Sequence, residues 1–474
     1  MTARSLPRSH TGAATIALGL LALSGCATFS SDGGFAPIEQ TAKDRLGKDV
    51  IWARNELDRN TIDKRVAELL EQPLSVEGAV QIALLNNKGL QSSFYEIGIS
   101  EADLVRSGRL PNPGISFGRL RQGSEIEIDH GIQFNLARLL ALPLARRAES
   151  RRFEQTRVAV TMDMLSLASA TRKSYYLTLA ADETVRYMYQ VQTAAQAGAE
   201  LARRQVEAGN WNKLQQAREQ SFYADAAVNL ARAEQARGAA RERLTRLMGL
   251  WGQQTQFILP ERLPDLPMVP KDLPDVEQVA LSQRLDVQEA KLGTEQLAKN
   301  LGLTRATRFI NVLELGLVRN SFNDAPAQRG YEISLELPIF DWGTAKVAKA
   351  EALYMQAVNR TAETAVNARS EVREAYARYR STYDIARQYR DEIVPLKKRI
   401  SEENQLRYNG MLIGVFELLA DARSQIASVN GYIESLRDFW LAQADLDMAL
   451  TGKPNMSALP AATMSAMDIG AGGH

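Results

Sequence analysis

The chain has 474 residues, 45% of them hydrophobic, with 57 basic and 56 acidic residues and a formal net charge of +1. Because neither sign dominates and no basic block stands out, the composition offers no electrostatic case for nucleic-acid binding. The only cysteine, Cys26, excludes disulfides within the chain and cysteine-based metal sites.

The N-terminus has the features of a secretory signal. Two arginines precede an apolar run over residues 13–23, and "LSGC" ends at Cys26. The run is too short to cross a bilayer but fits the core of a signal peptide. "LSGC" resembles the bacterial lipobox, which implies cleavage after residues 1–25 and a covalent lipid on Cys26; a plain secretory signal with an incidental cysteine is the alternative. Ala27, rather than Asp, implies the outer membrane.

Residues 26–73 are predicted to form a tether followed by a short helical segment. Ser75 then precedes a run of apolar residues, a pattern typical of a helix N-cap. A proline-dense linker, residues 260–274, cannot form regular helix and divides the chain near its middle. The tail, residues 454–474, is rich in Ala, Gly and Met and is predicted to be disordered.

The segments on either side of the linker resemble each other. "LSVEGAVQIALLNNKGLQ" is echoed by "LPDVEQVALSQRLDVQ", and "QVEAGN" by "RYNGM". We therefore predict two repeats, residues 74–259 and 275–453, each with the order helix, two strands, very long helix, turn and helix. The fold class is mainly α with β.

The predicted strands have two unlike faces. Polar and apolar residues alternate through residues 125–136, and again over 313–317 and 331–337. The weakest pattern lies near residues 115–121. Each strand is close to the length of about 9–11 residues that a tilted strand needs to cross a bilayer. The acidic face fits a wet lumen and the isoleucine face fits lipid; a soluble hairpin with one buried face is the alternative.

The last strand leads into a helical pattern that contains no proline until Pro395. At 1.5 Å per residue, residues 343–408 would span on the order of 100 Å, so this rod must pack on neighbouring helices. Small and aromatic residues recur there at alternating steps of three and four, which is a coiled-coil seam. The seam comprises Ala365, Ala368, Val372, Ala375, Tyr379, Thr382, Ala386, Tyr389, Ile393, Leu396 and Ile400.

Four strands cannot close a membrane barrel alone, because known barrels begin near eight strands. Several chains must therefore contribute to one barrel, and the same assembly would bring the rods into a ring.

Several segments resemble the TolC-type outer-membrane efflux factor family: "LPIFDWGTAKVAKAEA", "RLDVQEA", "EIVPLKKRI", "RYNGMLIGVFELLADAR" and "ALTG". No single segment is diagnostic, but their order and spacing together are specific to this family. The resemblance covers roughly residues 74–453. It implies a homotrimer whose twelve-stranded β-barrel is continued by a coiled-coil α-barrel. It also implies a passive exit duct in a Gram-negative outer membrane, joined through a periplasmic adaptor to an inner-membrane transporter.

The resemblance also suggests site residues. Pro338 and Gly343 are expected to let the chain change from strand to helix. Acidic residues of the pore constriction would correspond to Glu417 and Asp421, although they lie four apart where the family is expected to have three. The helix turns that should face the adaptor contain Gly209, Asn210, Asn409, Gly410 and Met411.

No catalytic constellation accompanies these features. The three histidines, His10, His130 and His474, cannot form a Ser/His/Asp set or a histidine metal cluster. No phosphate-binding loop occurs, and no cofactor is expected beyond the lipid on Cys26. Two other interpretations remain open, a periplasmic adaptor and a non-conducting structural lipoprotein.

Overall fold

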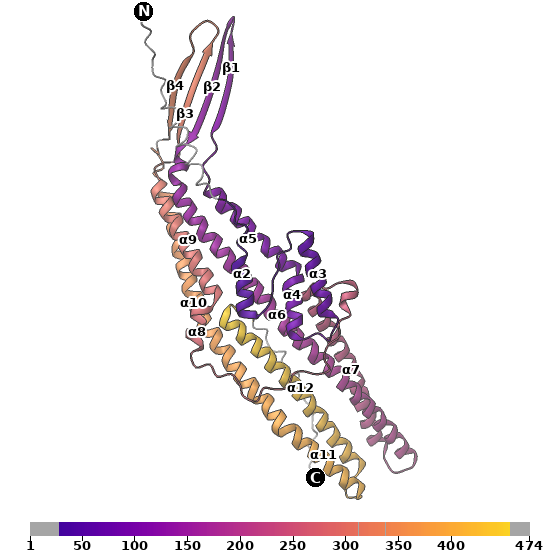
Figure 1. Cartoon of the computed structure of the whole chain (residues 1–474). Helices are drawn as coiled ribbons and strands as arrows, with labels where there is room; N and C mark the ends of the chain where they lie inside the picture. Colours follow the sequence, from indigo (N-terminus) through magenta and orange to yellow (C-terminus); the bar gives the residue numbers. More distant parts are fainter. Residues whose placement is uncertain (1–27, 311, 337, 456–474) are drawn as a thin grey trace, which may run out of the picture. The chain divides into compact units, whose positions relative to one another are not determined.

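The computed structural model describes residues 28–310, 312–336 and 338–455, so the signal peptide, Cys26 and the end of the tail lie outside the described residues. The chain is mainly helical and contains one four-stranded sheet (Figure 1). It divides into two compact units. Among the described residues, unit 1 contains 28–37, 94–160 and 288–364, and unit 2 contains 38–93, 161–287 and 365–455.

The sheet belongs to unit 1 and has the order β1-β2-β3-β4, with antiparallel neighbours throughout. The strands are β1 (Gly114–Gln122), β2 (Glu125–Asn135), β3 (Leu313–Phe322) and β4 (Gln328–Leu335). The prediction of two hairpins from two halves of the chain is confirmed, including the weakly patterned first strand. The pairing of β2 with β3 joins the two hairpins into one sheet (Figure 1).

The register keeps the two sheet faces chemically distinct. Ile115, Ile132, Leu317 and Tyr331 lie in one row across all four strands, and each is more than two fifths exposed. The opposite face carries all five carboxylates of the strands: Glu125, Glu127, Asp129, Glu314 and Glu332. An exposed apolar face of this size marks an interaction surface.

Below the sheet in unit 1, the strands lead to helices that pack through polar contacts. These helices are α5 (Lys88–Ser107), α6 (Leu136–Glu207), α9 (Leu285–Thr307) and α10 (Thr344–Gln388). Arg151 of α6 contacts Glu295 of α9 at 3.2 Å, and the hydroxyls of Thr294 and Thr361 lie 2.8 Å apart between α9 and α10. Hydroxyl pairs of this kind let two helices approach closely.

Unit 2 contains the remaining helical elements. They are α2 (Ala36–Thr41), η2 (Ala42–Leu46), α3 (Glu56–Leu70), α4 (Val76–Asn86), α7 (Lys213–Met248), η3 (Gly252–Thr255), α8 (Val276–Gln283), η4 (Tyr389–Ile393), α11 (Val394–Asn409) and α12 (Val415–Thr451), together with the later part of α6 and the end of α10. Ser75 caps α4 as predicted, because its hydroxyl accepts a hydrogen bond from Gly78 N at 3.0 Å. Within the described residues, no helix is both long and apolar enough to cross a bilayer.

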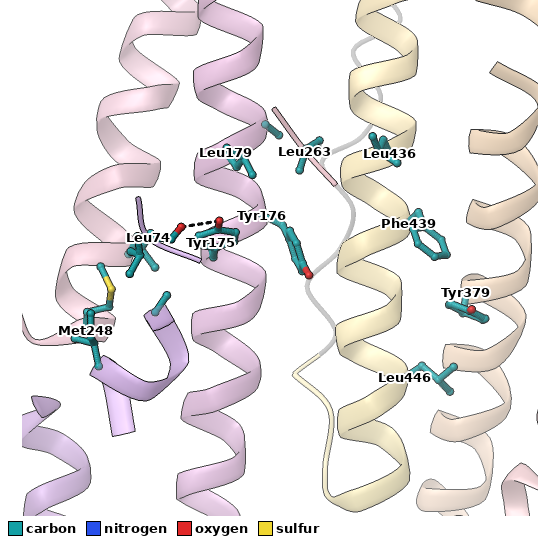
Figure 2. Packing of buried hydrophobic residues seen from close by; sticks show 14 of the residues in the cluster. Leu74, Tyr175, Tyr176, Leu179, Met248, Leu263, Tyr379, Leu436, Phe439 and Leu446 are labelled. Carbon is teal, nitrogen blue, oxygen red and sulfur yellow. Dashed lines mark hydrogen bonds between the residues drawn. The ribbon is translucent and has the colours of Figure 1, made fainter. Parts of the chain in front are cut away.

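The core of unit 2 joins residues far apart in the sequence (Figure 2). Tyr175 of α6 donates a buried hydrogen bond to the carbonyl of Leu74 at 2.8 Å. Phe439 of α12 is fully buried, and its ring lies 5.5 Å from that of Tyr379 on α10. Burying such aromatic side chains contributes roughly 1.5–3 kcal/mol each, so this core ties the helices of both halves of the chain together.

The proline-dense linker has no regular secondary structure, as its composition predicts, but it is firmly held. Leu263 and Leu266 are buried in the core of unit 2. Tyr383 donates to the carbonyl oxygens of Pro267 and Met268, and Trp440 Nε1 donates to that of Pro264. These side chains donate the hydrogen bonds that backbone N–H groups would supply in a sheet or helix.

The predicted rod after Gly343 is helical to Asn409, but η4 interrupts it with a π-helical turn. The seam is buried from Ala368 to Ala386, as predicted. Beyond η4, however, Leu396 is 54% exposed. The prediction of one continuous seam is therefore wrong there, because a π-helical turn holds an extra residue and rotates the following face.

The region predicted as a tether contains ordered helices. α2 and η2 fall between residues 36 and 46, where Ile38 and Ala42 are fully buried. Gly47 ends η2 with a φ of 62°, the left-handed conformation that glycine adopts without strain. A high content of Gly, Ser and Thr is therefore compatible with ordered turns as well as with a tether.

Candidate functional site

The turn between α6 and α7 is built by the backbone. Gly209 has a φ of 77°, and its N–H bonds to the carbonyl of Val206 at 3.0 Å. The amides of Asn210 and Trp211 both bond to the carbonyl of Gln205. A capping box between Asn212 and Gln215 then starts α7. The predicted left-handed glycine is confirmed here, and Gly209 and Asn210 are exposed.

Charges near the end of α6 neutralise one another. The carboxylate of Glu200 accepts hydrogen bonds from Arg203 and Arg204, which lower its pKa to about 2. Arg203 also reaches Glu207 at 2.8 Å. These solvent-accessible pairs contribute little stability, but they leave this part of α6 without a strong net charge.

The turn between α11 and α12 departs from the prediction. Gly410 has a φ of −82°, and the left-handed residue is Met411, with a φ of 61°. A non-glycine residue in this conformation is strained by roughly 1 kcal/mol or more. Met411 is nevertheless 93% exposed, and Leu412 beside it is 77% exposed. Asn409 ends α11 and is exposed as well. Strained, exposed apolar residues at a helix turn are typical of a contact surface.

The two predicted constriction residues lie in the first turns of α12. Glu417 is exposed, which leaves its carboxylate open to ions. Asp421, one turn later, is only partly exposed, and its Oδ2 is buried without a hydrogen bond in the described chain. Although both residues are on α12, they therefore have different environments.

A buried ion pair near these residues was not predicted from the sequence. Arg423 of α12 contacts Glu219 of α7 at 2.6 Å, and the Glu219 side chain is only 2% exposed. The Arg423 guanidinium also lies over the ring of Phe222, 4.3 Å from its centre. The pair connects the two helical hairpins, since α7 follows the first turn and α12 the second. A 204-residue separation in sequence gives no local pattern that could have indicated it.

The strand-to-helix junctions differ between the two halves. β2 runs into α6 without a break, and the side chain of Asn135 accepts a hydrogen bond from Arg138 N at 2.8 Å, as in a helix N-cap. Between β4 and α10, an irregular segment contains Pro338 and ends at Gly343. The Gly343 amide bonds to Asp341 Oδ1 at 2.9 Å. Of the two junctions, the second requires a left-handed backbone conformation, which Gly343 adopts.

Gly343→Ala is expected to destabilise unit 1 by about 1–3 kcal/mol. Gly343 has a φ of 73°, and an added Cβ would lie 2.8 Å from the Arg308 carbonyl oxygen. The measurement is the free energy of unfolding of the detergent-solubilised protein. Gly302→Ala is the matched control, because Gly302 lies within α9 with open space around it. The control should be neutral or slightly stabilising, and equal effects of the two substitutions would contradict the proposed steric requirement.

Among the residues that the structure describes, no group of three or more His, Cys, Asp or Glu side chains is arranged to hold a metal ion. His130 lies on the apolar face of β2, where its ring meets that of Phe117 edge-on at 5.4 Å. The His130 ring therefore packs against a neighbouring strand.

A two-faced sheet that leads into long helices, with two helical hairpins joined near their turns, is the fold of several solved outer-membrane channels. The structure resembles that of CusC, with a TM-score of 0.65 and 20% identity over 80% of this chain and 92% of that one. It also resembles the open state of the MtrE outer membrane channel of Neisseria gonorrhoeae, with a TM-score of 0.67 and 20% identity over 80% of this chain and 89% of that one.

At the level of sequence, the cobalt-zinc-cadmium resistance protein CzcC of Cupriavidus metallidurans is 26% identical over 286 residues. That match covers 57% of this chain, and the chain spans 64% of the length of this curated relative. No family model matches the chain. The predicted resemblance to TolC-type outer-membrane channels is confirmed in fold, including the mainly helical class with a small sheet.

Proposed function

We propose that the chain is the outer-membrane channel of a tripartite efflux pump and performs no chemistry itself. The observation that carries the proposal is the four-stranded sheet, with an exposed apolar face and an opposite face that holds every strand carboxylate. Such a sheet fits a wall between lipid and water. A periplasmic adaptor, the first alternative, would need one helical hairpin and soluble β-domains instead.

The sheet edges support assembly from several copies. β1 and β4 each pair on one side only within the chain. An unpaired strand edge cannot remain in hydrocarbon, because its N–H and C=O groups would lack partners. In a homotrimer, β4 of one copy would pair with β1 of the next, which gives twelve strands and closes the wall. The rods would then continue the passage into the periplasm.

The helix turns are the proposed contact with the periplasmic adaptor, which would connect the channel to an inner-membrane transporter. Four apolar side chains at or beside these turns are exposed: Leu214, Leu406, Met411 and Leu412. Gly209, Asn210, Asn409 and Gly410 form the turns between them. Burying these apolar groups against a partner would provide the driving force for docking.

The location also belongs to this proposal. A lipid on Cys26 would hold the N-terminus in the outer membrane of a Gram-negative bacterium, after removal of residues 1–25. Residue 28, the first described one, follows Cys26 by two positions in the sequence and belongs to unit 1.

Cations are the proposed favoured permeants. The carboxylates of the polar sheet face and of Glu417 would be repeated by each copy around one passage. Carboxylate rings select cations in narrow pores. The curated relative is named for resistance to cobalt, zinc and cadmium, which is consistent with cationic cargo.

The test is conductance in planar lipid bilayers. The purified protein should form cation-selective channels, and Glu417→Ala with Asp421→Ala should weaken block by divalent cations about fivefold or more. The physical reason is that a carboxylate about 4 Å from an ion contributes roughly 1 kcal/mol per unit charge even in bulk water.

Glu363→Ala with Glu403→Ala is the matched control, because both carboxylates are exposed on other helices. Unchanged block in the α12 variant would remove Glu417 and Asp421 from the constriction. Absence of any conductance, together with a monomeric state in detergent, would contradict the channel function itself.

A further inference from the structure

The apolar face of the sheet has a second, basic zone. Towards the hairpin ends of the strands, basic side chains join the apolar residues Phe117, Ile126 and Ile128 on this face. The basic side chains are Arg119, Arg121, His130, Arg319 and Arg329. All five are exposed. We call this set the basic zone.

One row of the basic zone is electrostatically unfavourable by itself. His130, Arg319 and Arg329 lie directly opposite one another on β2, β3 and β4. Arg319 and Arg329 are the one pair of directly opposed residues in the described sheet in which both side chains are charged. Cα atoms of directly opposed residues are only about 4.5–5.5 Å apart, and like charges in this arrangement destabilise a sheet.

No carboxylate of the sheet compensates these arginines. All five strand carboxylates lie on the opposite face, and Arg119, Arg319 and Arg329 form no ion pair with any carboxylate that the structure describes. Arg121 bonds only to the backbone, through Nε and the carbonyl of Gly123 at 3.0 Å. The basic zone therefore presents several guanidinium groups without a protein anion.

The position of the basic zone indicates where an anion would come from; this step rests on the proposed function. The apolar rows lie nearer the ends that join α6 and α10, and the basic rows lie nearer the hairpin turns (Figure 1). If the helices extend into the periplasm, the basic zone lies where the outer leaflet meets the external medium. Its side chains would then face lipid headgroups rather than the lumen.

We propose that the basic zone binds the phosphate groups of a phosphorylated glycolipid in the outer leaflet. Arginine donates paired N–H groups to phosphate oxygens, and such charge-assisted hydrogen bonds are stronger than neutral ones. A glycolipid that carries two phosphates on one sugar headgroup can neutralise both Arg319 and Arg329. Phe117, in the same row on β1, and Ile132, in the adjacent row, would contact the start of its acyl chains.

The experiment measures binding of purified bis-phosphorylated lipid A to the detergent-solubilised full-length protein by native mass spectrometry. Wild-type protein is expected to retain lipid A, and Arg319→Gln with Arg329→Gln should weaken binding at least tenfold. Arg319→Lys with Arg329→Lys, which keeps the charge but not the paired donors, should be intermediate. Arg360→Gln with Arg399→Gln is the matched control, because these exposed arginines lie on helices.

Further comparisons make the outcome decisive. Equal binding by the glutamine variant and wild type would overturn the proposal, as would equal affinity for phosphatidylglycerol or inorganic phosphate. If the double variant does not fold, Arg119→Gln alone should still weaken lipid A binding. Conductance of the glutamine variant should match wild type, so loss of lipid binding with intact conductance separates this proposal from the channel function.

Discussion

Arg284→Ala is expected to lower the free energy of unfolding of unit 2 by about 3–5 kcal/mol, the usual cost of removing one partner from a buried ion pair. The Arg284 side chain is 1% exposed and forms two hydrogen bonds to Asp286, at 3.0 and 2.7 Å. It also contacts Glu371 at 2.6 Å. Although burial lowers its pKa, the contacts with Asp286 and Glu371 outweigh burial and raise the pKa of Arg284.

Without the guanidinium, two carboxylates would remain close together with no cation between them. The measurement is denaturant unfolding in detergent, followed by circular dichroism of the helices. Arg360→Ala, at an exposed site on α10, should change the free energy of unfolding by less than about 0.5 kcal/mol. A loss below 1 kcal/mol for Arg284→Ala would show that the ion pair is dispensable.

Arg423→Ala is expected to loosen the contact between the two helical hairpins and raise the single-channel conductance. It leaves the nearly buried carboxylate of Glu219 without its cation, and it removes the guanidinium from the ring of Phe222. A buried, unpaired carboxylate favours separation of α7 from α12, because separation returns it to water.

A double-mutant cycle identifies the pair as the cause. The double variant Glu219→Gln with Arg423→Gln should be more stable than the summed stability losses of the two single variants predict. The coupling energy, measured by thermal unfolding, should be about 1–3 kcal/mol. Arg399→Ala on α11 is the control for loss of charge and should leave conductance unchanged. Additive single effects, or conductance unaffected by Arg423→Ala, would show that the pair does not hold the hairpins together.

The sequence was most informative where a short-range period determines structure. Alternation predicted β2 and β4, and Ser75 predicted the start of α4, because both signals act within a few residues. The left-handed residue after α11 was harder to place. Gly410 is the residue with the higher propensity, but the backbone places Met411 there, since three successive amides bond back to the end of α11.

Contacts between distant segments could not be predicted in the same way. Glu219 and Arg423 are ordinary charged residues in helical patterns, and only the packing of α7 against α12 removes Glu219 from water. Likewise, the row of His130, Arg319 and Arg329 depends on the register between strands from both halves of the chain. Register is set by turns and packing rather than by any residue in the row.

The π-helical turn η4 changes how related chains should be compared. Across residues 389–393 the helix holds one residue more per turn than its surroundings, so a heptad frame counted from Ala368 no longer identifies the same side of the rod in α11. An alignment that keeps one frame through this point would misassign inward and outward positions up to Asn409. One heptad frame therefore applies up to Tyr389, and a second frame, offset by the extra residue of η4, applies after it.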